Sequence, residues 1–161
     1  LLRQRLDAVF PKLQTNAHIL VFTHWRTEEA TRQVIKNAGF QIRGSLIWAK
    51  ERYGLGDLEG SFSPSHERII HAVKGSPSLT RRRKDVLSAK RVDSNHHPTE
   101  KPVGLLRTLI EATTVEGELV ADPFGGVAKT LGAAVSANRR AWGCEVEEDY
   151  HSYGKSVLQS L

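Results

Sequence analysis

The sequence predicts an α/β fold, with a mostly parallel β-sheet and helices on both of its faces. Three observations support this. The second half of the chain alternates helix, strand, helix, strand and helix by its apolar spacing, as parallel strands joined by crossover helices do. The apolar run at 17–23 has the composition of a buried parallel strand. A length of 161 residues with 39% hydrophobic residues suits one domain with its own core.

The first half of the chain is predicted to contain two helices and three strands. In order, these are a helix at 1–10, a strand at 17–23, a helix between Thr27 and Gly39, and strands at 40–50 and 66–73. Thr27 is a typical helix N-cap and Gly39 a typical stop. The second helix carries an inward stripe of Ala30, Val34 and Ala38. The glycine-rich stretch at 53–64 predicts a loop.

The second half follows an exposed, serine-containing insertion at about 76–95. Its predicted elements are a helix starting at Pro102, a strand at 118–122, a helix at 127–137, a strand at 140–145 and a helix at 149–161. Proline suits a first helical turn because N–H groups there have no acceptor within the helix, so the N–H that proline lacks is not needed. Val103, Leu106 and Ile110 form the apolar stripe of the first of these helices.

Composition excludes several classes of protein. The single cysteine, Cys144, cannot form an internal disulfide and is compatible with a reducing compartment. No apolar run approaches the ~18 residues that a membrane span needs, and the first residues do not resemble a signal peptide. The sequence therefore predicts a cytoplasmic protein with no membrane partner, and leaves its oligomeric state open.

The net charge of +5 is concentrated in one short segment. Between residues 81 and 91, six basic residues stand against the single acid Asp85: Arg81, Arg82, Arg83, Lys84, Lys90 and Arg91. A basic segment on an otherwise neutral chain favours a polyanionic partner such as DNA, through contacts with phosphate. The alternative is a solvated loop that contacts nothing.

Two motifs carry the chemistry. Asp122 to Thr130 reads Asp-Pro-Phe-Gly-Gly-Val-Ala-Lys-Thr, a strand end followed by a glycine turn, where the backbone can approach a ligand closely. Glu145 ends the next strand, where an acid can accept hydrogen bonds from ribose hydroxyls. This spacing fits dinucleotide and S-adenosylmethionine sites alike, although the dinucleotide site prefers Gly-x-Gly-x-x-Gly. The second motif, His97 to Pro102, reads His-Pro-Thr-Glu-Lys-Pro.

Together these motifs resemble those of the DNA amino-methyltransferases, which methylate the N6 of adenine or the N4 of cytosine. The match covers Asp122, Pro123, Phe124, Gly126 and Thr130, with departures at Val127, Ala128 and Lys129. The order of the halves resembles the circularly permuted, beta-type group, and the short insertion its compact phage-like or orphan members. The resemblance implies a Rossmann-like fold, S-adenosylmethionine as cofactor and double-stranded DNA as substrate.

The resemblance also implies site residues and a division of the chain. The implied cofactor-binding residues are Thr99, Lys101, Asp122, Pro123, Phe124, Gly126 and Glu145. Thr99 and Lys101 would lie near the methionine carboxylate, and Glu145 would hold the ribose. Residues 1–161 would form one methyltransferase domain. Its parts would be a catalytic-side half at 1–75, a basic target-recognition insertion at 76–95 and a cofactor-binding half at 96–161.

The catalytic Asp-Pro-Pro-Tyr segment of that family does not occur in these residues, because no two of the six prolines are adjacent. We expect that segment and its strand upstream of Leu1, between the strands at 19–21 and 119–121, so that the present fold is incomplete. The catalytic residues stay unknown. The alternative function is a catalytically inactive relative that acts as a DNA-binding module or partner subunit.

The remaining residues favour no other chemistry. The seven histidines lack a recognisable zinc spacing, so no metal site is predicted. A small-molecule methyltransferase or dinucleotide enzyme is a third reading, against which the basic insertion argues. Trp25 and Trp48 are predicted to lie in the core or to line the site, and the alternative is that either stacks on a base.

Overall fold

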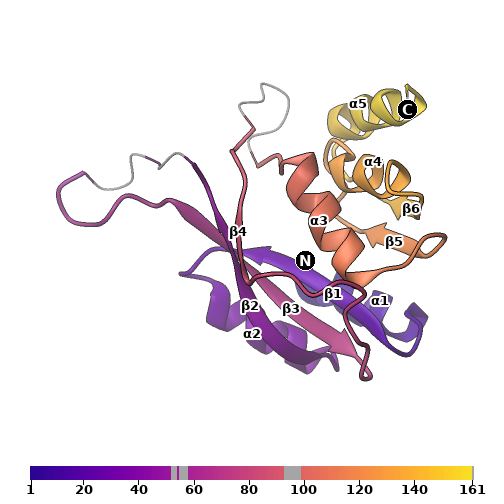
Figure 1. Cartoon of the computed structure of the whole chain (residues 1–161), viewed down its shortest axis with the longest axis horizontal. Coiled ribbons are helices and arrows are strands. Elements are labelled where there is room, and N and C mark those ends of the chain that lie inside the picture. Colours follow the sequence, from indigo (N-terminus) through magenta and orange to yellow (C-terminus); the bar gives the residue numbers. More distant parts are fainter. Residues whose placement is uncertain (52–53, 55–57, 93–98, 161) are drawn as a thin grey trace. The chain divides into compact units, whose positions relative to one another are not determined.

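The computed structural model describes residues 1–51, 54, 58–92 and 99–160 (Figure 1). The chain forms two compact units. The first comprises Leu1–Ser78 and Lys84–Ser88, and the second comprises Leu79–Arg83 and Ala89–Leu161. Residues of the predicted insertion at 76–95 are thus shared between the units.

The first unit is built on a four-stranded mixed sheet. Its elements are α1 (Leu2–Val9), the 3-10 turn η1 (Phe10–Lys12), β1 (Ala17–Thr23), α2 (Glu28–Asn37), β2 (Gln41–Ala49), β3 (His66–Lys74) and β4 (Val86–Ser88). The strand order is β1-β3-β2-β4. The β1–β3 and β2–β3 pairs are antiparallel, and the β2–β4 pair is parallel.

The strand at 17–23 was predicted to be parallel, and this prediction is wrong, because β1 pairs with β3 in the antiparallel direction. An apolar run reports burial but carries no information on strand direction. The connection from β2 to β3 was a better indicator of strand direction. Its sequence predicts a loop without a helix, whereas parallel neighbours need a crossover that is usually helical. Strand β4 was not predicted, because its three residues are too few for a recognisable period.

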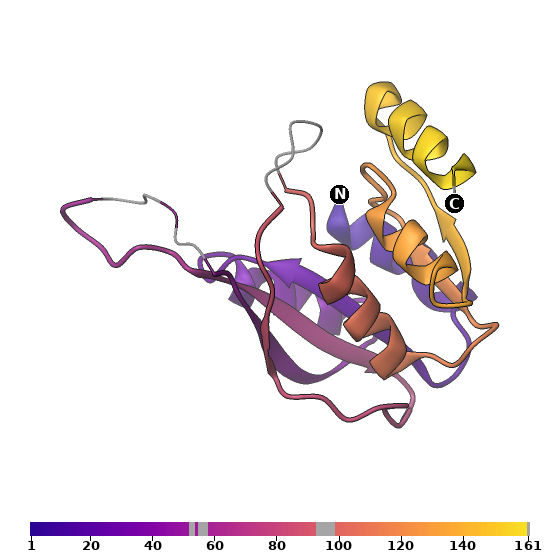
Figure 2. The same cartoon turned by 45° about the horizontal axis from the view of Figure 1, so that its top comes forward.

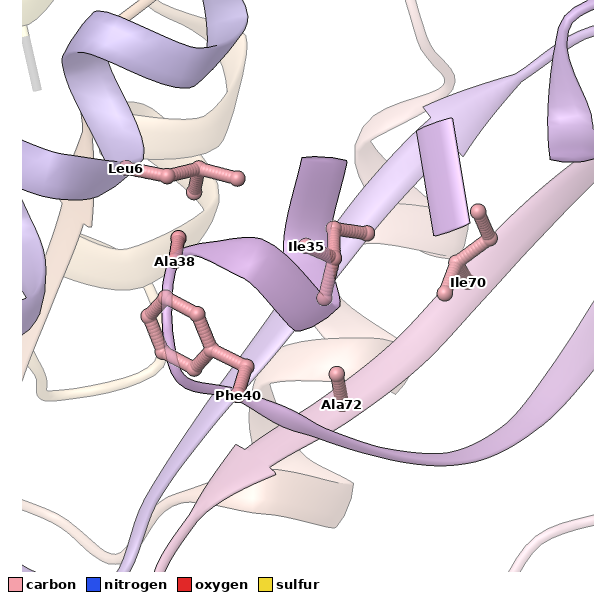
Figure 3. Close-up of a cluster of buried hydrophobic side chains, with 6 residues drawn as sticks. All are labelled: Leu6, Ile35, Ala38, Phe40, Ile70 and Ala72. Atoms are coloured by element: carbon pink, nitrogen blue, oxygen red, sulfur yellow. The ribbon is translucent and has the colours of Figure 1, made fainter. Parts of the chain in front are cut away.

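The core of the first unit lies between α1, α2 and one face of the sheet (Figure 3). Its buried side chains are Leu6, Ile35, Ala38, Phe40, Ile70 and Ala72. Ile35 is fully buried in α2, whereas Ala30, predicted to lie in the inward stripe, is exposed. Phe10 packs edge-on against Phe40, with ring centroids 4.8 Å apart, and so joins η1 to this core.

The second unit has the predicted alternation of helices and strands. Its elements are α3 (Val103–Thr113), β5 (Leu119–Asp122), α4 (Lys129–Val135), β6 (Arg140–Gly143) and α5 (Glu148–Gln159). Helix α4 is the crossover between the parallel strands β5 and β6 and packs against both, and α3 and α5 pack against α4 (Figure 2). Leu106 and Ile110 of the predicted α3 stripe are buried, but Val103 is exposed.

The register of β5 and β6 positions the predicted site. Leu119 pairs with Arg140 and Asp122 with Gly143, so both strands end at the same edge of this small sheet. Because the strands are parallel, the segments that leave their carboxyl ends start side by side. Asp122 and the residues after Gly143 are therefore brought together, as the sequence predicted.

Candidate functional site

The turn between β5 and α4 is held in shape by hydrogen bonds to its own backbone. The Asp122 carboxylate accepts a hydrogen bond from the Phe124 N–H at 3.0 Å. The Gly125 N–H donates to the Cys144 carbonyl at 2.9 Å, which ties the turn to the end of β6. Gly126 has a φ of +51°, in the left-handed region that glycine adopts without strain. The Phe124 side chain is left 44% exposed at this turn.

Glu145 joins the two strand ends through both of its carboxylate oxygens. One oxygen accepts a hydrogen bond from the Gly126 N–H at 2.7 Å. The other accepts from the N–H groups of Val146 at 2.7 Å and Glu147 at 3.0 Å. A carboxylate that accepts hydrogen bonds from several amides is fixed in orientation. Glu145 thus sets the shape of the glycine turn, a contact that its position at a strand end did not predict.

Close backbone packing at Gly143 draws β5, β6 and α4 together. A Cβ atom at Gly143 would lie 2.8 Å from Cδ1 of Leu131 and 3.0 Å from the carbonyl oxygen of Asp122. A side chain there would push the strand ends apart. Cys144 follows directly, and its Sγ lies 3.5 Å from the carbonyl oxygen of Pro123. Cys144 thus packs against the turn that follows β5.

Ala128 occupies the position where the resembled motif has a glycine. Its backbone has φ 61° and ψ 22°, a left-handed conformation at the N-cap of α4. The residue is buried, and a Cβ built on Gly154 of α5 would lie 3.0 Å from the Ala128 Cβ. The Ala128 methyl group therefore packs toward α5. The absence of a side chain at Gly154 makes room for it.

An ion pair links the second motif to α4. Nζ of Lys129 lies 3.2 Å from Oε1 of Glu100, whose side chain is only 6% exposed. Glu100 stands between the predicted cofactor residues Thr99 and Lys101, so this pair fixes their segment against the first turn of α4. His97 and Pro98 of the motif lie outside the described residues. Sequence reasoning missed this pair, although both partners belong to the two motifs that it identified.

The predicted DNA-binding residues do not form one continuous structural group. Arg81 and Arg83 belong to the second unit and approach a single carboxylate on α3, that of Glu111. Nitrogens of the two arginines lie 3.5 and 3.9 Å from its Oε2. Nε of Arg107 donates to its Oε1 at 2.8 Å. Lys84 belongs to the first unit.

The charges around Glu111 keep it ionised. The hydrogen bond from Arg107 is the main cause that lowers the pKa of Glu111, and the charges of Arg107, Arg81 and Arg139 add to it, while burial opposes them. The other predicted DNA-binding residues, Arg82, Lys84, Lys90 and Arg91, are exposed. Glu111 was missed from the sequence; the spacing of four residues from Arg107 on one helix was its only signal.

The two tryptophans singled out from the sequence lie in different environments. Trp48 is buried in β2, which confirms its predicted place in the core. Trp25 is 60% exposed after β1, with the Arg26 guanidinium 5.2 Å from its ring centroid, so it does not lie in the core. The alternative, that it lines the site, stays a prediction. Among the described residues, no three His, Cys, Asp or Glu side chains are grouped as a metal site would require. No described helix is long and apolar enough to cross a membrane.

Comparison with known proteins agrees with this geometry. The DNA methylase family matches residues 1–156, so the chain belongs to that family. It is 34% identical over 161 residues to "Putative methylase YubD" of Escherichia coli K12, covering 99% of this chain and 70% of that protein. It is 28% identical over 145 residues to "Type II methyltransferase M2.DpnII" of Streptococcus pneumoniae, covering 78% of this chain and 54% of that protein.

The fold is shared with solved structures. The crystal structure of the M1.HpyAVI–SAM complex superposes with a TM-score of 0.85 at 21% identity and covers 98% of this chain and 81% of that one. The chain thus has the α/β fold of the S-adenosylmethionine-dependent DNA methyltransferases, as predicted. It spans about half the length of M2.DpnII.

Proposed function

We propose that this protein transfers a methyl group from S-adenosylmethionine to an exocyclic amino group in double-stranded DNA, either N6 of adenine or N4 of cytosine. Membership of the DNA methylase family over residues 1–156 is the observation that carries this proposal. The joined ends of β5 and β6 support it, because ligands of open α/β sheets sit at the carboxyl ends of the strands.

The chemistry of the side chains at these strand ends fits the cofactor. S-adenosylmethionine has an adenine ring, two ribose hydroxyls, a positive sulfonium and amino group, and a carboxylate. We propose that Phe124 packs against the cofactor and that Glu145 accepts hydrogen bonds from the ribose. The bonds from main-chain N–H groups to its two oxygens hold this carboxylate at the strand ends, where the ribose would lie.

The remaining predicted residues would complete the cofactor site. Lys101 and Thr99 would bind the methionine carboxylate, because a cation and a hydroxyl both suit a carboxylate. Asp122, Pro123 and Gly126 would shape the turn that the cofactor contacts. When bound, the cofactor supplies an electrophilic methyl group, and the protein would hold the flipped base against it.

We further propose a role for the segment at 76–95 and for the order of the two halves. The arginines and lysines of this segment would contact phosphates and position the enzyme on DNA. The cofactor-binding half follows the other half in the chain, and this order supports the circularly permuted arrangement.

Methyl transfer from radiolabelled S-adenosylmethionine to unmodified double-stranded DNA tests the function. We expect labelled DNA from a protein that carries the Asp-Pro-Pro-Tyr segment, which residues 1–161 lack. Chromatography of the nucleosides will identify the product as N6-methyladenine or N4-methylcytosine. Binding of DNA and cofactor without any transfer would contradict the proposal. That result would instead support the inactive, DNA-binding alternative.

A further inference from the structure

Three arginines approach one carboxylate at the surface of the second unit, and a fourth lies next to two of them in the sequence. We call Arg81, Arg82, Arg83 and Arg107, together with Glu111, the arginine cluster. Glu111 contacts three of the arginines, at 2.8 Å from Arg107, 3.5 Å from Arg81 and 3.9 Å from Arg83. Arg82 is exposed between the two arginines that approach the carboxylate. The cluster brings together residues from two segments of the chain, 81–83 and α3.

The backbone also attaches this basic segment to α3. The N–H groups of Thr80 and Arg81 donate to the Ala112 carbonyl near the end of the helix, at 2.9 and 3.4 Å. The side chain of Glu111, one residue earlier, is only 19% exposed. The segment is therefore held at its backbone and by a largely covered carboxylate, with the arginines on the outside.

The cluster keeps ample capacity to bind an anion. A guanidinium has five N–H donors, and each of the three arginines presents one nitrogen to Glu111 in these ion pairs. Their side chains stay 43–63% exposed. Four positive charges against one negative charge leave the cluster strongly positive. Arginine is the side chain best suited to phosphate, because its planar fork can donate two parallel hydrogen bonds.

We propose that the arginine cluster binds phosphate groups of the DNA backbone, and that Glu111 is the positioning residue that holds Arg81, Arg83 and Arg107 together for this purpose. DNA as the partner rests on the proposed function. In the absence of the carboxylate, like charges would drive these arginines apart and the long side chains would lose their common orientation. Glu111 thus increases affinity for a polyanion although it is itself an anion.

Salt-dependent DNA binding tests this proposal. We would measure the Kd of the protein for a short double-stranded DNA at salt concentrations between about 50 and 200 mM. The wild type is compared with Glu111→Gln and with the control Glu116→Gln, which removes the same charge from an exposed acid after α3. The slope of log K against log salt becomes shallower by about 0.9 for each phosphate that the protein no longer neutralises.

We expect Glu111→Gln to bind DNA about tenfold more weakly at low salt, with a slope that is shallower by about two, because two arginines stop contacting phosphate. Glu116→Gln should bind as tightly as the wild type or slightly more tightly, with an unchanged slope. Binding by Glu111→Gln that equals or exceeds that of Glu116→Gln, with the wild-type slope, would overturn the proposal. Glu111 would then be a simple source of repulsion.

A second comparison shows whether Glu111 acts through the arginines. Arg81→Gln/Arg83→Gln should itself make the slope shallower by about two. Adding Glu111→Gln to this variant should change affinity by less than about twofold, since two of the three arginines that it positions are already gone. An equal further loss in both backgrounds would refute the positioning role. If Glu111→Gln fails to fold, the salt dependence of Arg81→Gln/Arg83→Gln tests the phosphate site. A slope equal to that of the wild type would refute this site.

These measurements are independent of catalysis. Suppose that the variants show the expected slope changes in DNA binding but the wild type transfers no methyl group. That result would support the phosphate site and contradict the proposed function. Methyl transfer by the wild type, together with wild-type slopes in all variants, would support the proposed function and contradict the phosphate site.

Discussion

Glu145 is the residue in which structure and proposed function overlap most closely. Its two oxygens accept three hydrogen bonds from main-chain N–H groups, and these bonds join the turn after β5 to the segment after β6. The same carboxylate is the proposed ribose ligand. Phe124 offers a contrast, because its exposed ring has little part in holding the turn together.

Glu145→Gln and Phe124→Ala should therefore separate stability from cofactor binding. Glutamine has only one acceptor oxygen, and its NH₂ group would face a main-chain N–H, so we expect a loss of about 1–3 kcal/mol in the free energy of unfolding as well as weaker cofactor binding. Phe124→Ala should weaken binding of S-adenosylmethionine by about tenfold with little change in stability. Denaturant unfolding and calorimetric titration measure the two quantities. Wild-type cofactor affinity in Phe124→Ala would contradict its proposed role.

The contact between Ala128 and Gly154 gives a second prediction at this scale. Helix propensity alone would make Gly154→Ala stabilising by about 1 kcal/mol. The new methyl group would, however, lie 3.0 Å from the Ala128 Cβ and 3.2 Å from the Val127 carbonyl carbon. We therefore expect Gly154→Ala to be destabilising, by about 1–3 kcal/mol, as overpacking is.

The double-mutant cycle isolates this contact. Ala128→Gly alone should stay within about 1 kcal/mol of the wild type, because relief of the left-handed strain offsets the flexibility that glycine gives the unfolded chain. In that background Gly154→Ala should cost at least about 1 kcal/mol less than in the wild type. Thermal unfolding of the four proteins measures the cycle. Equal costs in both backgrounds would show that the two residues do not interact.

At the scale of elements, the ion pair between Lys129 and Glu100 attaches the segment of the second motif to α4. Its carboxylate is nearly covered, and loss of the lysine would leave that charge without its partner. The pair therefore matters to the position of Thr99 and Lys101, which flank Glu100 in the sequence.

We expect Lys129→Gln to destabilise the protein by about 2 kcal/mol and to weaken cofactor binding, because a buried carboxylate is left unpaired. Adding Glu100→Gln should restore part of the stability, since no charge then stays buried. Lys155→Gln, at an exposed lysine of α5, is the matched control and should have no effect. Unfolding in denaturant and titration with S-adenosylmethionine measure both effects. A double variant less stable than Lys129→Gln would argue against the pair.

The elements also show which features a sequence can predict. The alternation around α4 was predictable because helix and strand periods are local, and a glycine turn after a strand marks a ligand-binding edge. The pairing of β1 with β3 was not predictable, because the partner of a strand lies far away in the sequence. The same limit applies to Lys129 with Glu100 and to Glu111 with Arg81, whose residues meet only after folding. Trp25 shows that an aromatic residue next to a strand need not be buried.

At the scale of the whole molecule, stability should depend on pH through the first unit's sheet. Nδ1 of His18 lies 2.9 Å from Nε2 of His71, and their rings stack at 5.2 Å. Burial lowers the pKa of His71 from its usual 6.5, and the charges of His18 and Arg43 lower it further. The folded protein therefore resists protonation at a pH where the unfolded chain accepts the proton. Stability is fully present above pH 6.5 and is lost as the pH falls below it.

We expect the free energy of unfolding to fall as the pH is lowered from about 7 to about 5.5, and to fall less steeply in His71→Gln, which cannot take up this proton. Denaturant titrations at several pH values measure both slopes. His151→Gln, at an exposed histidine of α5, serves as the control and should keep the wild-type slope. Identical slopes in the wild type and His71→Gln would contradict this origin of the pH dependence.

The close approach of α5 to the turn before α4 also bears on how this sequence can change over generations. A lineage with alanine at 128 is committed to glycine at 154, whereas glycine at 128 removes one of the close contacts that a side chain at 154 would make and leaves those with the main chain of residues 127 and 128. The order of the two substitutions then matters. A larger residue at 154 is less destabilising when Ala128→Gly comes first than when it comes second. Among relatives of this chain, the identities at 128 and 154 should thus be inherited as a pair.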